Sequence, residues 1–266
     1  MCELFAMSTR VPTTVCLSLE EFSRHGGLSG PHKDGWGIAW YDARDVRVVK
    51  EAFPAWDSAC VRFIHDNPFA TAFALSHIRK ATRGDVALRN CQPFVRELGG
   101  AWHAFAHNGD LPGVERDARL QPGAFRPVGE TDSERVFCAL LERLRPLWLA
   151  GGPPAVAARR YVIERFAAEL RGFGPANFLY CYGDALFAHA DRRHQADGTI
   201  SPPGLWRLTR RCAAGGELAA AGLRIEAHGT EQEVTLLASV PLTAEGWEPL
   251  RRGEVLVVRD GRAIGR

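Results

Sequence analysis

The chain opens with Met1-Cys2-Glu3-Leu4-Phe5-Ala6, which places a cysteine directly behind the initiator methionine. Removal of Met1 would turn the main-chain nitrogen of Cys2 into a free α-amine, so this thiol would carry a candidate base on its own Cα. An unperturbed α-amine has a pKa of about 7.7–8.0 and a thiol about 8.5, so proton transfer between them costs only about 1 kcal/mol. Because any residue can follow a start codon, Cys2 is predicted as a nucleophile only if other residues support it.

The composition is that of an ordinary globular chain. Its 266 residues are 46% hydrophobic and 24% charged, enough to bury a full core. No linker divides it, and we expect a single domain over residues 1–266. The 33 basic and 31 acidic residues are interleaved and do not indicate a nucleic-acid partner. No apolar stretch approaches the roughly 18 residues of a spanning helix and no signal peptide opens the chain, so we expect no membrane partner and a cytoplasmic location.

Cysteines and histidines give no sign of a metal site. The seven cysteines include no C-x-x-C pair, and an odd number cannot all pair within one chain, so we expect reduced thiols. His103 and His107 would share one face of a strand, but no H-E-x-x-H motif or comparable third ligand accompanies them. We therefore expect no metal and no cofactor.

The element order predicts the fold class. Runs rich in aromatic and β-branched residues predict strands, and apolar spacing predicts helices, most clearly after Thr131-Asp132-Ser133-Glu134, which has the pattern of a capping box. Strands, a helix pair and strands again, without βαβ alternation, indicate an α+β layered sandwich. The predicted helices are 57–66, 131–148 and 155–170, and the predicted strands are 36–41, 46–50, 72–78, 101–107, 177–182, 185–188, 233–242 and 254–258.

Two charged positions have both an ordinary and a functional interpretation. Arg79 ends a predicted strand, and is either a solvated or salt-bridged side chain or a bidentate fork for a carboxylate. Asp132 either stabilises a helix N-terminus, by roughly 0.3–1 kcal/mol, or binds an ammonium group. Together the two would grip the α-carboxylate and α-amine of a free amino acid and leave its side chain free to reach Cys2.

The segment His107-Asn108-Gly109-Asp110 also has two interpretations. Asn-Gly is the strongest short hairpin signal, so the simple prediction is a turn. Alternatively, the Asn108 amide and the Gly109 backbone N–H converge as two donors on a developing oxyanion, where one donor is typically worth about 3 kcal/mol. The segment after Leu205 carries no chemistry that we can assign, and we expect it to complete the sandwich.

Taken together, these motifs resemble the class II glutamine amidotransferases, the N-terminal-nucleophile family in which cysteine opens the mature chain, and most closely its stand-alone members. The resemblance spans most of the chain, and the motifs are specific when they occur together in this order. They are Met1-Cys2-Glu3-Leu4-Phe5-Ala6-Met7-Ser8, His32-Lys33-Asp34-Gly35-Trp36-Gly37-Ile38-Ala39, His77-Ile78-Arg79-Lys80-Ala81-Thr82, Ala106-His107-Asn108-Gly109 and Gly129-Glu130-Thr131-Asp132-Ser133-Glu134.

The resemblance implies a fold and a set of roles. The fold is a four-layer αββα sandwich of two antiparallel sheets. Cys2 would be the nucleophile and its freed α-amine the base, with removal of Met1 required, because a main-chain amide cannot act as that base. The remaining roles would be an oxyanion hole formed by Asn108 and Gly109, a glutamine clamp formed by Arg79 and Asp132, and a pocket lined by Thr82.

Two departures from the family pattern concern the pocket. Where members often have a histidine before Pro-Phe, this chain has Gln92, which can hydrogen-bond but cannot titrate. Lys80 and Arg83 stand where several relatives carry an aromatic residue and a histidine, and we expect them to reshape the pocket entrance.

Three hypotheses remain open at this point. The first is a glutaminase-type amidotransferase that attacks L-glutamine through a γ-glutamyl thioester, and either supplies ammonia to a separate synthase or acts on free glutamine. The second is a hydrolase of a larger γ-glutamyl amide conjugate. The third is a non-catalytic ligand-binding protein of the same fold that retains Met1.

Overall fold

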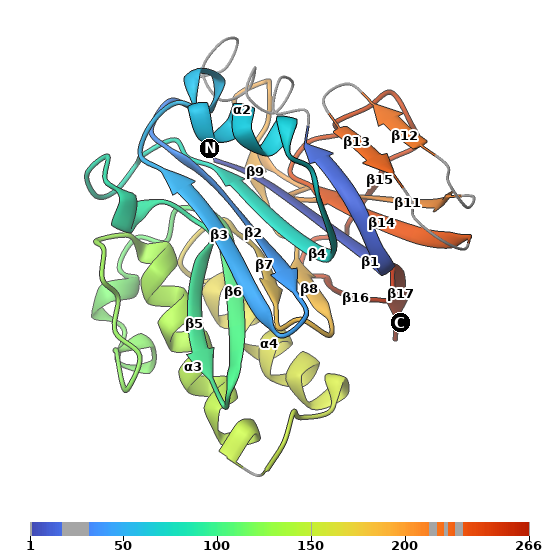
Figure 1. The fold of residues 1–266 in the computed structure, drawn as a ribbon. Helices are drawn as coiled ribbons and strands as arrows, with labels where there is room; N and C mark the ends of the chain where they lie inside the picture. The colour runs from blue at the N-terminus through green and yellow to red at the C-terminus, as the bar shows by residue number, and fades with distance from the viewer. Residues whose placement is uncertain are drawn as a thin grey trace.

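The computed structural model describes residues 2–17, 32–149, 151–212, 217–220, 223–226 and 231–265, with side chains omitted for 14–17, 217–220 and 223–226. Two antiparallel sheets lie face to face, with α3 (Asp132–Leu149) and α4 (Val156–Leu170) covering one of them and α2 (Ala59–Asp66) lying on the other (Figure 1). The chain is therefore an α+β sandwich, as the sequence predicts. Met1 lies outside the described residues.

The larger sheet has the strand order β15-β11-β14-β1-β4-β2-β3, with β13 also paired to β1 and β12 paired to β13. Its central strand is the N-terminal one, so Cys2 directly precedes the middle of a sheet. The strands are β1 (Glu3–Leu17), β2 (Trp36–Asp42), β3 (Asp45–Glu51), β4 (Phe69–Ile78), β11 (Trp206–Cys212), β12 (Glu217–Ala220), β13 (Leu223–Glu226), β14 (Gln232–Ala238) and β15 (Glu248–Pro249).

The smaller sheet has the order β17-β16-β8-β7-β6-β5. Its strands are β5 (Phe94–Leu98), β6 (Ala101–Gly109), β7 (Ala176–Cys181), β8 (Leu186–His189), β16 (Val255–Arg259) and β17 (Arg262–Ile264). A separate hairpin pairs β9 (Arg193–His194) with β10 (Ile200–Ser201). Short 3₁₀ turns complete the described structure: η2 (Ala55–Asp57), η3 (Leu88–Asn90), η4 (Val114–Arg116) and η5 (Ala118–Leu120).

Strand β1 shows how the sequence builds the layers. Successive strand side chains point to opposite faces. Leu4 and Ala6 pack between the two sheets, whereas Phe5 and Met7 pack on the outer face against the layer that contains α2. All four are essentially inaccessible to solvent, and burying a side chain the size of Phe5 or Met7 contributes about 1.5–3 kcal/mol. An unbroken apolar run is therefore required here, because both faces of the strand are buried.

Helix α3 begins as the capping-box pattern predicts. The Thr131 hydroxyl accepts a hydrogen bond from the Glu134 N–H at 3.2 Å. The Glu134 carboxylate accepts from the N–H groups of Val128 and Gly129, at 3.0 and 2.6 Å, and also pairs with Arg96. In a capping box the glutamate would bond the backbone N–H of the cap residue, but here the Glu134 carboxylate bonds the loop just before it. These bonds fix the first turn of α3, which begins at Asp132.

The predicted strands and helices are confirmed with small shifts at their ends, and two predictions are wrong. Asn108-Gly109 is no hairpin turn: both residues end β6 and pair with Asn177 and Ala176 of β7. Strand β14 ends at Ala238, short of the predicted 242. Pro241, inside the predicted range, lacks the N–H that a ladder needs, so a strand through 242 was not to be expected. As expected, the segment after Leu205 completes the sheets.

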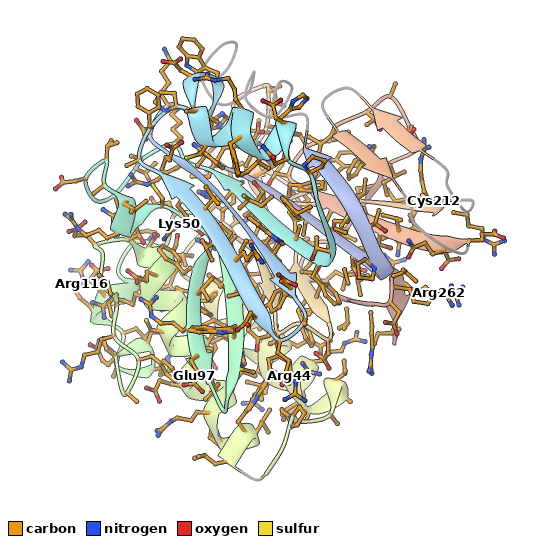
Figure 2. The ribbon with its side chains drawn as sticks, viewed as in Figure 1. Arg44, Lys50, Glu97, Arg116, Cys212 and Arg262 are labelled. Atoms are coloured by element: carbon orange, nitrogen blue, oxygen red, sulfur yellow. The ribbon has the colours of Figure 1, made fainter. Side chains whose placement is uncertain are left out.

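Charged side chains are spread over the surface. Figure 2 shows Arg116 and Arg262 at opposite edges of the molecule, pointing outward, and their side chains are 82% and 68% exposed. None of the helices in the described ranges is both long and apolar enough to span a membrane.

Candidate active site

Cys2 lies at the start of the central strand, next to the end of β4. The pairing of Glu3 with Ile78 brings residues 79 and 80 beside it. The half-buried Cys2 Sγ accepts a hydrogen bond from the Lys80 N–H at 3.3 Å and lies 3.4 Å from the Lys80 carbonyl oxygen. The thiol is therefore held by the main chain of the segment that follows Arg79.

The electrostatic surroundings of Cys2 act in opposite directions. Burial raises the pKa of the thiol, whereas the Lys80 hydrogen bond and the charge of Arg79 lower it, and the carboxylate of Asp132 raises it. Both charged residues are thus close enough to act on the sulfur. Because the net effect is a raised pKa, formation of a thiolate at neutral pH requires a base.

Asn108 and Gly109 flank the thiol from the other sheet. The fully buried Asn108 side chain donates to the Cys2 carbonyl oxygen and, at 3.3 Å, to Ser239 Oγ. A Cβ on Gly109 would lie 1.9 Å from the Pro175 carbonyl oxygen, so only glycine fits at that position. The amide of Asn108 is therefore oriented toward the residue that carries the thiol.

Gln92 fixes the backbone just before Asn108. Its side-chain amide donates to the His107 carbonyl at 3.1 Å and accepts from the His107 N–H at 2.7 Å. A glutamine makes both bonds without titrating, whereas a neutral imidazole has one donor and one acceptor on opposite sides of its ring. Gln92, which departs from the family pattern, thus holds the backbone that leads into Asn108 and Gly109.

Arg79 is 3% exposed and its fork is fully occupied. Its two terminal nitrogens donate to four carbonyl oxygens: Asp34 at 3.4 Å, Asp85 at 2.9 Å, Arg83 at 2.8 Å and Gly84 at 3.1 Å. Across the described ranges, no carboxylate forms an ion pair with it. The guanidinium thus organises the loop after β4 while its charge lacks a counter-ion there.

Asp132 shows the complementary situation in the first turn of α3. It is 9% exposed, and its carboxylate accepts from the N–H groups of Leu111 at 2.9 Å and Ser133 at 2.8 Å. No lysine or arginine in the described part of the chain forms an ion pair with it. The dipole at a helix N-terminus favours a negative charge, and Asp132 lies there without a lysine or arginine partner among the described residues.

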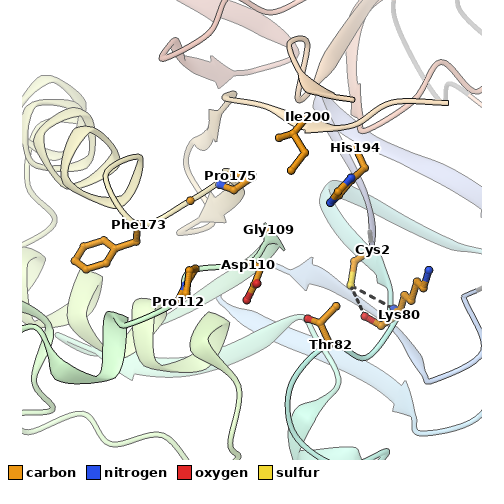
Figure 3. Close-up of a pocket in the computed structure, with 11 residues that line it drawn as sticks. Cys2, Lys80, Thr82, Gly109, Asp110, Pro112, Phe173, Pro175, His194 and Ile200 are labelled. Carbon is orange, nitrogen blue, oxygen red and sulfur yellow. Dashed lines mark hydrogen bonds between the residues drawn. The ribbon is translucent and has the colours of Figure 1, made fainter. Parts of the chain in front are cut away.

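A cavity of about 570 Å³ opens beside the thiol. Figure 3 shows Cys2 between His194 and Ile200 on one side and Thr82 and Lys80 on the other. Of the six predicted site residues, Cys2, Thr82 and Gly109 line this cavity, whereas Arg79, Asn108 and Asp132 are buried and do not line it. The structure places the other five near Cys2, but the clamp and the oxyanion hole stay predictions.

Several residues at the site were not singled out in the sequence. Phe173, His194 and Ile200 line the cavity, and Ser239 contacts Asn108. Each comes from a loop or hairpin brought in by packing, and Ser239 falls in the segment to which we assigned no chemistry. No local pattern marks these positions, so only the three-dimensional arrangement reveals them.

The described residues contain no group of three or more histidine, cysteine, aspartate or glutamate side chains that could hold a metal. His103 Nδ1 lies 2.7 Å from the Tyr180 hydroxyl and His107 Nδ1 lies 2.9 Å from Ser133 Oγ. The two histidines of the strand thus have separate local partners.

Comparison with known proteins places these features in a family. A model of the class-II glutamine amidotransferases matches residues 1–266. YafJ of Escherichia coli (strain K12), named as a candidate glutamine amidotransferase, is 38% identical over 259 residues, covering 96% of each chain. MJ1515 of Methanocaldococcus jannaschii, a protein without an assigned role, is 30% identical over 274 residues, covering 99% of this chain and 71% of the relative.

Comparison with solved structures gives a consistent result. The crystal structure of a predicted glutamine amidotransferase from Pseudomonas aeruginosa PA01 aligns over 100% of both chains with a TM-score of 0.73 and 35% identity. The glutamine phosphoribosylpyrophosphate amidotransferase of B. subtilis aligns with 99% of this chain and 48% of its own, with a TM-score of 0.62 and 16% identity. The second likeness concerns the fold alone.

Proposed function

Because the chain belongs to the class-II glutamine amidotransferases, we propose that it hydrolyses the side-chain amide of L-glutamine through a thioester on Cys2. The observation that carries the proposal is the position of the Cys2 thiol. It lies at a cavity that Gly109 also lines, and the Asn108 side-chain amide donates to the carbonyl oxygen of Cys2. The proposed unit is a single domain over residues 1–266, working in the cytoplasm.

The proposed reaction begins with removal of Met1, which frees the α-amine of Cys2. This amine takes the thiol proton, and the thiolate attacks the amide carbon. The charge that develops on the amide oxygen is stabilised by the Asn108 side chain and the Gly109 N–H. The C–N bond breaks as the α-ammonium returns its proton to the leaving nitrogen, and ammonia departs. Water then hydrolyses the γ-glutamyl thioester and restores the thiol.

Arg79 and Asp132 are proposed to hold the α-carboxylate and α-amine of the substrate. Both are buried next to Cys2, carry opposite charges and lack ion-pair partners within the described residues. In the present conformation carbonyl oxygens fill the fork of Arg79, so binding requires the carbonyls of Arg83 and Gly84 to give way. A substrate carboxylate is a stronger acceptor than a neutral carbonyl, by about a factor of two.

Among the described residues we assign no site for an acceptor of the ammonia. We propose that it passes to a separate synthase or is released as such. The reaction as written requires only water and the side chains named, and no cofactor or metal takes part.

Turnover of glutamine by the processed protein tests the proposal. Glutamate and ammonia should form in equal amounts, and Cys2→Ala should lower kcat by about 10⁴-fold or more, as loss of a nucleophile does in other acyl-transfer enzymes. Cys60→Ala is the matched control, because Cys60 is also a half-buried free thiol but does not line the cavity. Equal activity in the Cys2→Ala variant, or a purified protein that keeps Met1 and is inactive, would refute the proposal and favour a non-catalytic binding role.

A further inference from the structure

His107 is a buried titratable side chain to which the proposed reaction gives no role. It lies on β6 directly before Asn108, and because successive side chains of a strand point to opposite faces, its ring points away from Cys2. There it stacks with Phe105, whose ring packs against Phe137 of α3 with the two centroids 5.2 Å apart. The ring of His107 is thus held between the smaller sheet and α3 (Figure 1).

One ring nitrogen of His107 reaches the residue next to Asp132. His107 Nδ1 lies 2.9 Å from Ser133 Oγ, and the Ser133 hydroxyl donates to Asp132 Oδ1 at 3.3 Å. A serine hydroxyl has a single hydrogen, so Ser133 can donate to the carboxylate only if it accepts from His107. Nδ1 therefore carries the proton of the ring, and the hydrogen bonds run from His107 through Ser133 to Asp132.

The protonation state of His107 agrees with this arrangement. Burial lowers the pKa of the imidazole, although the carboxylates of Asp132 and Asp110 raise it. Because the net effect is a lowered pKa, the ring is neutral at neutral pH and has one N–H to donate. A neutral ring orients the Ser133 hydroxyl but adds no positive charge beside Asp132, whose cation a ligand would then supply.

The Asp132 carboxylate has room for one more donor. It accepts from the N–H groups of Leu111 at 2.9 Å and Ser133 at 2.8 Å, and from the Ser133 hydroxyl. An ionised carboxylate offers about four acceptor positions, so these three donors from the described residues leave about one for an ammonium group. Two of the three donors belong to Ser133, which therefore sets the direction of the remaining position.

The other ring nitrogen of His107 faces the proposed oxyanion segment. A Cβ on Gly109 would lie 2.9 Å from His107 Nε2. Nε2 is buried and has no hydrogen-bond partner among the residues that the structure describes, so it supplies shape at this point. The same ring thus lies against the strand end that carries the proposed oxyanion donors and, through Ser133, is linked to the proposed ammonium site.

We propose, on the basis of the function proposed above, that His107 is a positioning residue for substrate binding, which acts through Ser133 to orient the Asp132 carboxylate toward the α-ammonium of the substrate. His107 does not line the cavity beside Cys2. It fixes the ammonium site relative to Gly109, so that a substrate held at its α-ammonium presents its amide to the oxyanion donors.

Ser133→Ala in the processed full chain is the first test. The change removes the hydroxyl between His107 and Asp132, and alanine is a good helix former, so α3 should persist. KM for glutamine should rise by about 10-fold with little change in kcat, the result of weakening a hydrogen bond to a charged group that serves binding. Ser133→Thr keeps the hydroxyl and should restore KM. An unchanged KM, or a fall in kcat alone, would overturn the proposal.

A ligand without the α-amine tests whether the effect passes through Asp132. The probe is 4-carbamoylbutanoate, which is glutamine lacking that amine, used as a competitive inhibitor of glutamine turnover. Its inhibition constant should be the same in the parent and in Ser133→Ala, because it places no ammonium beside the carboxylate. An inhibition constant raised as much as KM would show general damage to the site and would overturn the proposal.

Variants of His107 locate the origin of the effect. His107→Leu should raise KM as Ser133→Ala does, whereas His107→Asn places an N–H near the position of Nδ1 and should largely restore KM. His103→Leu is the matched control, because His103 is also fully buried on the same face of β6 but lies 2.7 Å from the Tyr180 hydroxyl. A KM raised equally by His103→Leu would assign the effect to packing and overturn the proposal. A parent protein that turns over no glutamine would overturn the proposed function, and this inference with it.

Discussion

Two buried arginines, Arg79 and Arg159, show how the two ends of the sandwich differ. Arg159 is 1% exposed, and both of its terminal nitrogens donate to the Asp184 carboxylate at 2.6 Å. The rings of Trp148, Tyr182 and Phe187 lie 5.3–6.0 Å from its guanidinium carbon. Arg79 is 3% exposed, but its donors go to carbonyl oxygens alone.

This difference distinguishes an arginine with a structural role, Arg159, from one that we expect to bind a ligand, Arg79. A buried charge is costly unless it is paired and fully hydrogen-bonded. The charge of Arg159 is balanced by the Asp184 carboxylate, so this ion pair needs no ligand. Arg79 and Asp132 carry opposite charges beside Cys2 and lack counter-ions among the described residues, which is the arrangement expected where a zwitterionic ligand supplies both.

Acid should produce the largest effect, and mainly at the Cys2 end. Burial lowers the pKa of His77 to about 3 and those of His189 and His103 to about 4; the first two lie near His107, and His103 lies near Arg159. Above pH of about 6.5 the rings are neutral in both states. Below it the unfolded chain binds protons first, so each ring lowers the free energy of unfolding by about 1.4 kcal/mol per pH unit until its folded pKa is reached.

Urea unfolding between about pH 7 and pH 4.5 measures this effect, with a combined slope from the three rings of up to about 4 kcal/mol per pH unit. His77→Gln and His103→Gln should each lower this slope by about 1.4 kcal/mol per pH unit, the contribution of one proton. A slope unchanged by both variants would show that the rings are not neutral in the folded protein.

Arg159→Ala should cost stability without affecting catalysis. Breaking a buried pair by removing one partner costs about 3–5 kcal/mol, because the Asp184 carboxylate loses its cation. Chemical denaturation should show this loss, while KM for glutamine in the folded fraction stays as in the parent. A raised KM with unchanged stability would reverse the assignment of the two ends.

Asn108→Ala should lower kcat by about 10²–10³-fold, the effect of losing one oxyanion donor. Ser239→Ala is the control, because it removes the other hydrogen-bond partner of Asn108 while leaving its donor in place. If both variants lowered kcat equally, Asn108 would act by packing and not as a donor to the reaction.

Arg79→Lys should give the smallest effect and the sharpest contrast with Arg159. Lysine keeps the charge but loses the planar fork, so KM for glutamine should rise by about 10–100-fold, the value of a hydrogen bond to a charged group. The change in kcat should be small. Steady-state kinetics on the variant test this, and a loss of stability with unchanged KM would leave Arg79 with a purely structural role.

Local patterns predicted the elements well, because alternation and capping are read within a few residues. The helix α3 begins after Thr131 as its sequence indicates. Strand β1 was not among the predicted strands, because its apolar run is buried on both faces and shows no alternation of apolar and polar residues. The prediction of a turn at Asn108-Gly109 was wrong because a contact distant in sequence decides the conformation there. Asn108 and Gly109 are held in β6 by pairing with β7, far along the chain, and that contact overrides the local turn preference.

The site was predictable only where motifs carry it. Cys2, Thr82 and Gly109 line the cavity as the family resemblance implies. The rest of the cavity lining was not predictable. Pro175 reaches Gly109 at the end of β6 through a backbone contact, and Ile200 lies on a hairpin anchored at Asn177. Such contacts depend on tertiary packing and leave no periodic signal in the sequence.

The central claim is that Cys2 is a glutamine-reading N-terminal nucleophile. The most direct test is the intact mass of the native protein before and after treatment with the glutamine-analogue electrophile 6-diazo-5-oxonorleucine, with Cys2→Ala as control. The account predicts a chain without Met1 that gains one adduct, and no adduct on the control. Retention of Met1 without an adduct, or an adduct that persists in the Cys2→Ala variant, would contradict it.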